Sequence, residues 1–401
     1  MSRTIRVMLL GLAGALAMAI HGGMPSRGVF VRIPTSRAKP AAIAPPPRFL
    51  APLPPLVGID PLVMVSKTVG WAFPLWSVAH TTDGGRRWQN VTPRGVQLTM
   101  PANAASVSIP SPQVVWILSG NAQAANVLKT HLYLTTSAGR RWSVRRFSSA
   151  PGGYITALNG REAFVLVLRG PASGPEAVNI YRTVDAGRTW RLVARTGARG
   201  RRSFPYQGGK TGLYFANPSD GVLTGFDPSG HPWVYATRDG GQQWQPAHLV
   251  IPPDLAGKPV TFGPVAFFGR RGHGVLIASE FGRHTVIYQT VDAGLDWSLA
   301  GAMPGLDGAG EQTVDIVSPG SLWAVANVSA TERPDTVLVR STTGGRTWQR
   351  VPGTLPPLVL ALDFLSGPIG YATTAGGGVW KTTDGGATWS RRPPVTPAVG
   401  P

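Results

Sequence analysis

Aspartate is the residue with the clearest potential for chemistry in this chain, because it recurs at one place in a repeated turn. The turn reads [ST]-x-[DST]-x-G-x-x-W, and its last copy is TTDGGATW over residues 382–389. A carboxylate could act there as a general acid or base, or as a metal ligand. It could instead accept hydrogen bonds from the amides of its own loop. We expect this structural role, since a glycine that relaxes the backbone and a large apolar tryptophan accompany the turn.

The turn occurs seven times, with aspartate in five copies and a hydroxyl residue in the second and sixth. Successive tryptophans of the turn lie roughly fifty residues apart, a period typical of repeat proteins. The residues expected to shape the turns are Asp83, Gly85, Trp88, Ser137, Trp142, Asp185, Gly187, Trp190, Asp239, Gly241, Trp244, Asp292, Gly294, Trp297, Thr343, Trp348, Asp384, Gly386 and Trp389.

Each turn ends a unit of short apolar segments that read as strands. In the last unit these are LVLALDF (358–364), IGYA (369–372) and GVWKTT (378–383), and a fourth strand leaves from the tryptophan. Four short strands repeated without helical periodicity indicate radial blades. The sequence therefore predicts an all-β fold, a seven-bladed β-propeller over residues 58–396, followed by a tail at 397–401.

The repeated turn is similar to the Asp-box, or bacterial neuraminidase repeat, of sialidases, xyloglucanases, sortilin-type receptors and the photosystem II stability/assembly factor family. The order of apolar strand, GWA (70–72), strand and TTDGGRRW (81–88) most resembles that last family, over roughly residues 58–396. The resemblance implies the propeller fold and a role as an assembly scaffold. This chain differs from cyanobacterial members in having no lipid-anchor cysteine.

Other Asp-box proteins are glycosidases, so an enzymatic alternative stays open. Sialidases have an Arg-Ile-Pro motif before their first Asp-box, and Arg32, Ile33 and Pro34 stand in that place here. A proline-rich stretch follows that motif, and sialidases have six blades rather than seven. Xyloglucanases pair two seven-bladed propellers across a cleft, and this chain supplies one.

Two carboxylates outside the turns occupy equivalent positions in neighbouring repeats. Asp315 and Asp363 each precede the aromatic residue of the following strand, Trp323 or Tyr371, by the same interval. Equivalent side chains point the same way around a ring, whereas acid–base hydrolysis of a glycoside needs two carboxylates that face each other. We therefore expect each to form a buried hydrogen bond between blades.

The charge balance is strongly basic, with 38 Lys and Arg against 19 Asp and Glu. The basic residues are scattered and no nucleic-acid-binding motif accompanies them, so we expect no specific nucleic-acid ligand. The chain has no cysteine, and its histidines lack metal-ligand spacing, so neither a metal nor a cofactor is expected. The partner expected from the charge is a protein, acidic in character, or an anionic envelope polymer.

One segment concentrates cations. The sequence RLVARTGARGRRSFPYQGGK (191–210) is expected to connect two blades on the face opposite the Asp-boxes. Guanidinium groups gathered in one loop suit carboxylates or phosphates, although a solvated loop without a ligand is an equal alternative. The candidate anion- or partner-binding residues are Arg195, Arg199, Arg201, Arg202 and Lys210.

The N-terminal residues 1–22 combine arginines with a short apolar run and a small-residue cleavage site. This pattern predicts a signal peptide, or an uncleaved anchor that would provide the only contact with a membrane. Residues 23–57 read as a proline-rich linker. We therefore expect an exported protein that acts as a non-catalytic binding or assembly scaffold.

Overall fold

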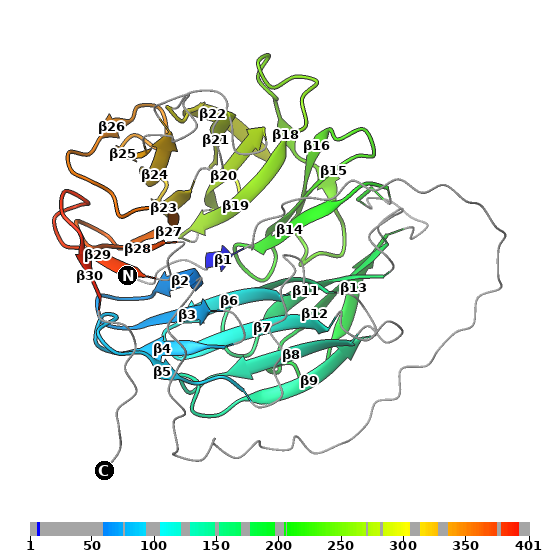
Figure 1. The fold of residues 1–401 in the computed structure, drawn as a ribbon. Helices are drawn as coiled ribbons and strands as arrows, with labels where there is room; N and C mark the ends of the chain where they lie inside the picture. Colours follow the sequence, from blue (N-terminus) through cyan, green and yellow to red (C-terminus); the bar gives the residue numbers. More distant parts are fainter. Residues whose placement is uncertain are drawn as a thin grey trace, which may run out of the picture.

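The described part of the chain consists of strands and turns. The computed structural model describes residues 6–8, 59–74, 77–93, 105–121, 129–148, 152–169, 177–196, 204–205, 207–269, 272–280, 284–304, 313–327, 336–374 and 378–392. The strands form seven small sheets arranged around a ring (Figure 1). The predicted all-β, seven-bladed propeller is therefore confirmed.

Each blade contains four antiparallel strands that follow one another in the chain from the ring axis outward. Blades 1 to 3 are β2–β5 (Ile59–Met64, Gly70–Pro74, Ala79–Thr81, Gln89–Asn90), β6–β9 (Ala105–Ser111, Val114–Asn121, Lys129–Thr135, Ser143–Ser148) and β10–β13 (Gly153–Ala157, Ala163–Leu168, Val178–Thr183, Arg191–Arg195). Blades 4 and 5 are β14–β17 (Lys210–Phe215, Gly221–Phe226, Pro232–Thr237, Gln245–Pro246) and β19–β22 (Thr261–Phe268, His273–Glu280, His284–Thr290, Asp296–Ala302). Blades 6 and 7 are β23–β26 (Val314–Ser318, Ser321–Asn327, Thr336–Ser341, Gln349–Arg350) and β27–β30 (Val359–Phe364, Gly370–Thr374, Val379–Thr382, Ser390–Arg391).

Two short strands extend blades beyond this plan. β18 (His248–Leu249), in the connection from blade 4 to blade 5, pairs in parallel with the outer strand β22. β1 (Arg6–Met8) pairs with the innermost strand β6 of blade 2 and also contacts β19, so it lies inside the ring (Figure 1). β1 falls within the predicted signal peptide, which stays a prediction.

The core lies in the seams between blades, because each sheet is covered on both faces by its neighbours. The second strand of blade 3, AFVLVL, is buried along almost its whole length, as its continuous apolar run requires. Aromatic rings stack directly across two seams, Phe164 on Phe215 with centroids 3.5 Å apart and Trp323 on Phe364 at 3.8 Å. Aromatic contact therefore contributes directly to the packing of one blade on the next.

The two inner-strand carboxylates bond neighbouring blades. Oδ2 of Asp315 accepts a hydrogen bond from the Phe364 amide of blade 7, and Oδ2 of Asp363 accepts one from the Met64 amide of blade 1, both at 2.5 Å. The expected inter-blade role is thus confirmed. Ser108 is the equivalent residue of blade 2, and its Oγ accepts a hydrogen bond from the Ala157 amide of blade 3 at 3.0 Å.

The ring closes where blade 7 meets blade 1. β2 lies beside β27 and β28, and the described strands show no exchange between these two blades. Asp363 supplies one bond across this seam, and the hydroxyl of Tyr371 donates to the carbonyls of Lys67 and Gly84 at 3.4 and 3.3 Å. Among the described residues, closure therefore depends on side-chain contacts, and no sheet is shared between these two blades.

Replacing the closing carboxylate tests its contribution to stability. The Asp363→Ala substitution leaves the buried Met64 amide without this acceptor, which we expect to lower the free energy of unfolding by about 1–3 kcal/mol. Asp363→Asn keeps a carbonyl acceptor and should cost less. Urea denaturation followed by tryptophan fluorescence measures both. Equal stability of the alanine variant and the unsubstituted protein would contradict the role of this bond.

Candidate functional site

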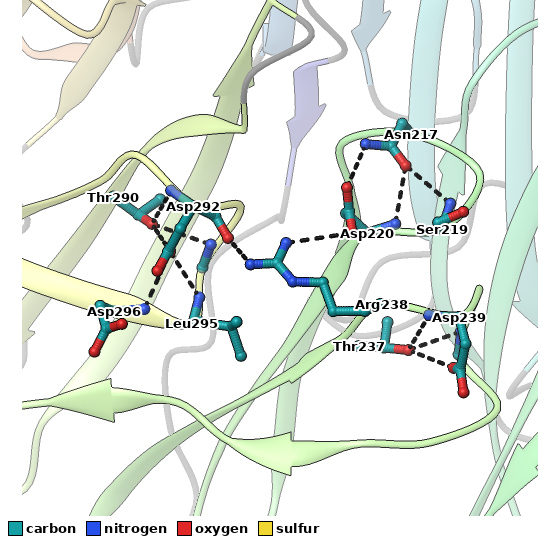
Figure 2. Close-up of polar contacts among 12 residues, drawn as sticks. Asn217, Ser219, Asp220, Thr237, Arg238, Asp239, Thr290, Asp292, Leu295 and Asp296 are labelled. Atoms are coloured by element: carbon teal, nitrogen blue, oxygen red, sulfur yellow. Dashed lines mark hydrogen bonds and ion pairs between the residues drawn. The ribbon is translucent and has the colours of Figure 1, made fainter.

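The aspartates of the repeated turns bind their own loops. In blade 4, Oγ1 of Thr237 donates to Oδ1 of Asp239 and accepts from the amide of Gly241, each at 3.0 Å. The same Oδ1 accepts the amides of Gln242 and Gln243 at 2.9 Å. Figure 2 shows Thr237 and Asp239 beside the equivalent Thr290 and Asp292 of blade 5. The carboxylate thus replaces missing backbone acceptors inside the turn.

In the two turns that have no aspartate, a side-chain hydroxyl accepts the hydrogen bond from the loop amide. Oγ of Ser137 accepts the amide of Arg141 at 3.0 Å, and Oγ1 of Thr343 accepts the amide of Thr347 at 2.9 Å. A hydroxyl oxygen accepts fewer of the loop amides than a carboxylate, yet it keeps the turn closed. The first residue of the turn is also functional, although the sequence analysis did not single it out. The sequence does indicate this role, because the first position of the turn is Ser or Thr in all seven copies.

The glycine of each turn faces the preceding blade. Gly386 of blade 7 has a φ of +93°, and a Cβ there would lie 2.1 Å from Cδ2 of Leu338 in blade 6. Gly294 of blade 5 has the same relation to Val222 of blade 4, at 2.4 Å. Glycine is required both by the left-handed backbone and by the close approach.

The tryptophans pack in the same direction. Trp88 belongs to a cluster with Tyr371 of blade 7, and Trp244 to one with Phe164 of blade 3. Both clusters also contain residues of the ring's own blade, such as Ala72 for Trp88 and Leu213 for Trp244, so each ring lies between its own blade and the preceding one. The reason is geometric, because the hairpin that carries the ring projects over that blade.

Blades 4 and 5 are also joined by a cation at the second position of a turn. The Arg238 guanidinium forms an ion pair with Asp220 of its own blade at 3.3 Å and donates a hydrogen bond to the carbonyl of Asp292 in the next turn (Figure 2). Asp220 in turn accepts a hydrogen bond from Nδ2 of Asn217 at 2.7 Å. This network fixes the distance between two neighbouring turns.

Hydrogen bonding keeps several turn carboxylates ionised. The side-chain hydroxyl of Thr388, with its amide and the hydroxyl of Thr382, lowers the pKa of Asp384 to about 2. Burial alone would raise the pKa of Asp83, Asp185 and Asp292, but the hydrogen bonds from their loops outweigh it and lower the pKa of each. A carboxylate held ionised by its own loop is a poor general acid.

Every acidic side chain that the structure describes has a hydrogen-bond or ion-pair partner. Outside the turns these include Asp254 with His284 and Glu280 with Lys258, each pair at 3.0 Å. Among the described residues no group of three His, Cys, Asp or Glu side chains is arranged to hold a metal ion. The described carboxylates therefore act in building the propeller.

The antiparallel topology places two kinds of connection at the end of the ring opposite the turns, which we call the loop face. It holds the links between blades and the turns between second and third strands, and its longest described parts are residues 226–232, 247–260 and 351–358. The Asp254–His284 ion pair ties one link to blade 5. Leu255 of the same link is buried in the core.

Two leucines are exposed on the loop face at the start of β27. The exposed fraction is 75% for Leu358 and 45% for Leu360. Leu358 also has a φ of +52°, in the left-handed region that side chains other than glycine seldom adopt. An exposed apolar residue in a strained conformation points to a contact surface.

The candidate basic residues divide between different strands. Arg195 is exposed at the end of the outer strand β13, whereas Lys210 begins the inner strand β14 and is only 3% exposed. The Lys210 ammonium donates to the carbonyl of Gly208 at 2.9 Å, so this residue is not part of the loop as expected. The strand begins at Lys210, three residues before its apolar residues at 213–215. Arg199, Arg201 and Arg202 lie outside the described residues.

The Arg-Ile-Pro motif, the linker and most of the predicted signal peptide also lie outside the described residues. The described part of the chain contains no helix long and apolar enough to cross a membrane.

The fold and these turns define the chain as a seven-bladed β-propeller whose hairpin loops are closed by Thr–Asp pairs or their hydroxyl equivalents. It is similar to YCF48 from Cyanidioschyzon merolae, with a TM-score of 0.52, 17% identity, and coverage of 82% of this chain and 97% of that chain. A structure of YCF48 bound to D1 peptide matches with a TM-score of 0.48, 18% identity, and coverage of 87% and 97%. An ulvan lyase matches with a TM-score of 0.49, 11% identity, and coverage of 85% and 98%. No protein-family model and no curated protein matches the sequence.

The lowered pKa values make stability sensitive to acid. The pKa of Asp384 is about 2 in the folded chain and near 3.8 ordinarily, so its stabilising contribution is complete above pH 3.8 and is lost as the pH falls through 2. Asp83, Asp185 and Asp292 act in the same direction. We expect the thermal midpoint to fall across this interval and the dependence to be shallower in Asp384→Asn. Identical pH profiles of the two proteins would contradict this.

Proposed function

We propose that the protein is an exported, non-catalytic binding scaffold that recognises a protein partner or an envelope component through the loop face. The observation that most supports this is the state of the carboxylates, since every described one is already bonded within the propeller. The basic residues outnumber them by two to one, with 38 against 19 in the whole chain. A surface with this balance attracts acidic partners.

The exposed leucines favour a protein over a polysaccharide. Leu358 and Leu360 offer apolar area at the mouth of the ring, next to the innermost strand of blade 7. Protein interfaces bury apolar side chains at their centre and carry polar groups around the rim. An acidic segment that also carries apolar side chains would match both the leucines and the basic surroundings.

Charge reversal in the basic loop tests the proposal. The variant R199E/R201E/R202E should recover at least about tenfold less partner than the unsubstituted protein in affinity capture from native cells at low salt. The matched control is R140E/R188E/R346E, which makes the same charge change on exposed arginines of the turns at the other end of the ring. Equal recovery by both variants would overturn the role of the loop. Glycan turnover without captured protein would favour an enzyme.

A substitution at Leu358 separates the effect of its backbone strain on stability from the effect of its side chain on partner binding. Leu358→Gly removes the exposed side chain and suits the left-handed backbone, so the free energy of unfolding should change by no more than about 1 kcal/mol. Partner capture should nevertheless fall, because the apolar contact is lost. Chemical denaturation and capture are measured on the same preparation. Undiminished capture would show that these leucines do not contact the partner.

A further inference from the structure

Blade 2 is the one blade whose sequence contains no Asp or Glu. Between Asp83 of blade 1 and Glu162 of blade 3 the chain has no acidic residue. Even the turn of this blade has Ser137 at the aspartate position. The cations of the blade are Lys129, Arg140, Arg141, Arg145 and Arg146. Its charge is therefore positive throughout, and no carboxylate of its own can neutralise it.

The outer strand of blade 2 is long and open at its edge. β9 has six residues, whereas β5, β17, β26 and β30 have two each. β9 is the last strand of its sheet, at the rim of the ring (Figure 1), and none of the described strands pairs with its outer edge. A row of unpaired backbone donors and acceptors is a template for another strand.

The fold already adds a strand to an outer edge in blade 5. β18 pairs with β22 so that His248 lies opposite Asp296 and Leu249 opposite Trp297. Nδ1 of His248 is 3.5 Å from Oδ1 of Asp296, so a histidine of the added strand faces a carboxylate of the outer strand. In blade 2 the charge on the outer strand has the opposite sign. A strand added there would match it with carboxylates.

Arg145 and Arg146 project from opposite faces of the blade 2 sheet. Arg145 lies opposite Leu132, which packs in the core between blades 2 and 3. Arg146 lies opposite His131, on the same face as Val144, which packs in the core between blades 1 and 2. Arg145 is partly buried and its guanidinium donates to the carbonyl of Val144 at 3.2 Å, while Arg146 is exposed. In the described part of the chain neither arginine forms an ion pair.

We propose that the outer edge of β9 is a docking surface for an extended acidic segment of another protein, which adds to blade 2 as a further strand with two consecutive Asp or Glu residues beside Arg145 and Arg146. Adjacent residues of a strand point to opposite faces, so consecutive carboxylates reach one arginine on each side of the sheet. Main-chain hydrogen bonds supply affinity in this mode of recognition, and the side-chain pairs supply specificity. The same arginines repel the equivalent edge of a second copy, which favours an acidic partner over self-association.

This surface is separate from the loop face of the proposed function. β9 lies at the rim of blade 2, whereas Leu358 and Leu360 belong to the start of blade 7 and the basic loop follows blade 3. Docking at β9 is measured with the purified protein and a peptide, so it can fail or succeed whatever the outcome of partner capture through the loop face.

Two peptides of one composition test the surface. Thr-Val-Thr-Glu-Glu-Thr-Val-Thr has adjacent glutamates, whereas Thr-Val-Glu-Thr-Glu-Thr-Val-Thr has both on one face of the strand. In fluorescence anisotropy titrations with the unsubstituted protein at constant ionic strength, the first should bind at least about tenfold more tightly, because only it reaches both arginines. Methyl groups on both glutamate amides should weaken its binding at least as much, since successive amides point to opposite edges and one of them faces β9. Hydrogen exchange of residues 143–148 should slow when the first peptide binds.

Substitution of the two arginines supplies the second test. R145Q/R146Q should bind the first peptide about tenfold less tightly and lose the preference for adjacent glutamates, with circular dichroism verifying that it folds. The matched control R191Q/R195Q makes the same charge change on exposed arginines of β13, the outer strand of blade 3, and should bind like the unsubstituted protein. No binding, equal affinity for the two peptides, or unchanged binding by R145Q/R146Q would overturn the proposal. Binding that needs the arginines but tolerates the methyl groups would indicate a general attraction of anionic polymers and would overturn strand addition.

Discussion

The propeller depends on the hydrogen bonds that the first residue of each repeated turn forms through its side-chain hydroxyl group. Oγ1 of Thr382 accepts the amide of Gly386 at 2.8 Å and donates to Asp384 at 2.7 Å, and the same pair of bonds recurs at Thr81. These bonds hold the glycine in its left-handed conformation and against the preceding blade. Because a four-stranded sheet cannot bury both faces alone, this local bond also determines how neighbouring blades pack.

Much of the architecture was predictable because the repeat imposes strict local requirements. Gly386 must adopt a positive φ beside Leu338, and Trp389 must fill the space in the same cluster. Neither position therefore accepts another residue type. The inter-blade role of Asp315 and Asp363 was also predictable, because their equivalent positions exclude a facing pair. Periodicity therefore carries information about contacts far apart in the chain.

Features that interrupt the repeat could not be predicted in this way. Lys210 reads as part of a basic loop, but strand pairing with Gly225 makes it the first residue of a buried strand. The parallel strand β18 arises in a connection whose sequence has no alternating pattern. Each of these depends on pairing between strands rather than on the order of residue types.

The chain ends could be placed between any two blades without dividing a blade. Since each blade takes its four main strands from one continuous stretch, the boundary between any two blades leaves every sheet whole. Residues 59 and 392 lie in the two blades that meet at the closing seam. A circular permutant that joined them and began at β14 would lose β1 but retain the four main strands of all seven sheets. In this topological sense the propeller has no first blade.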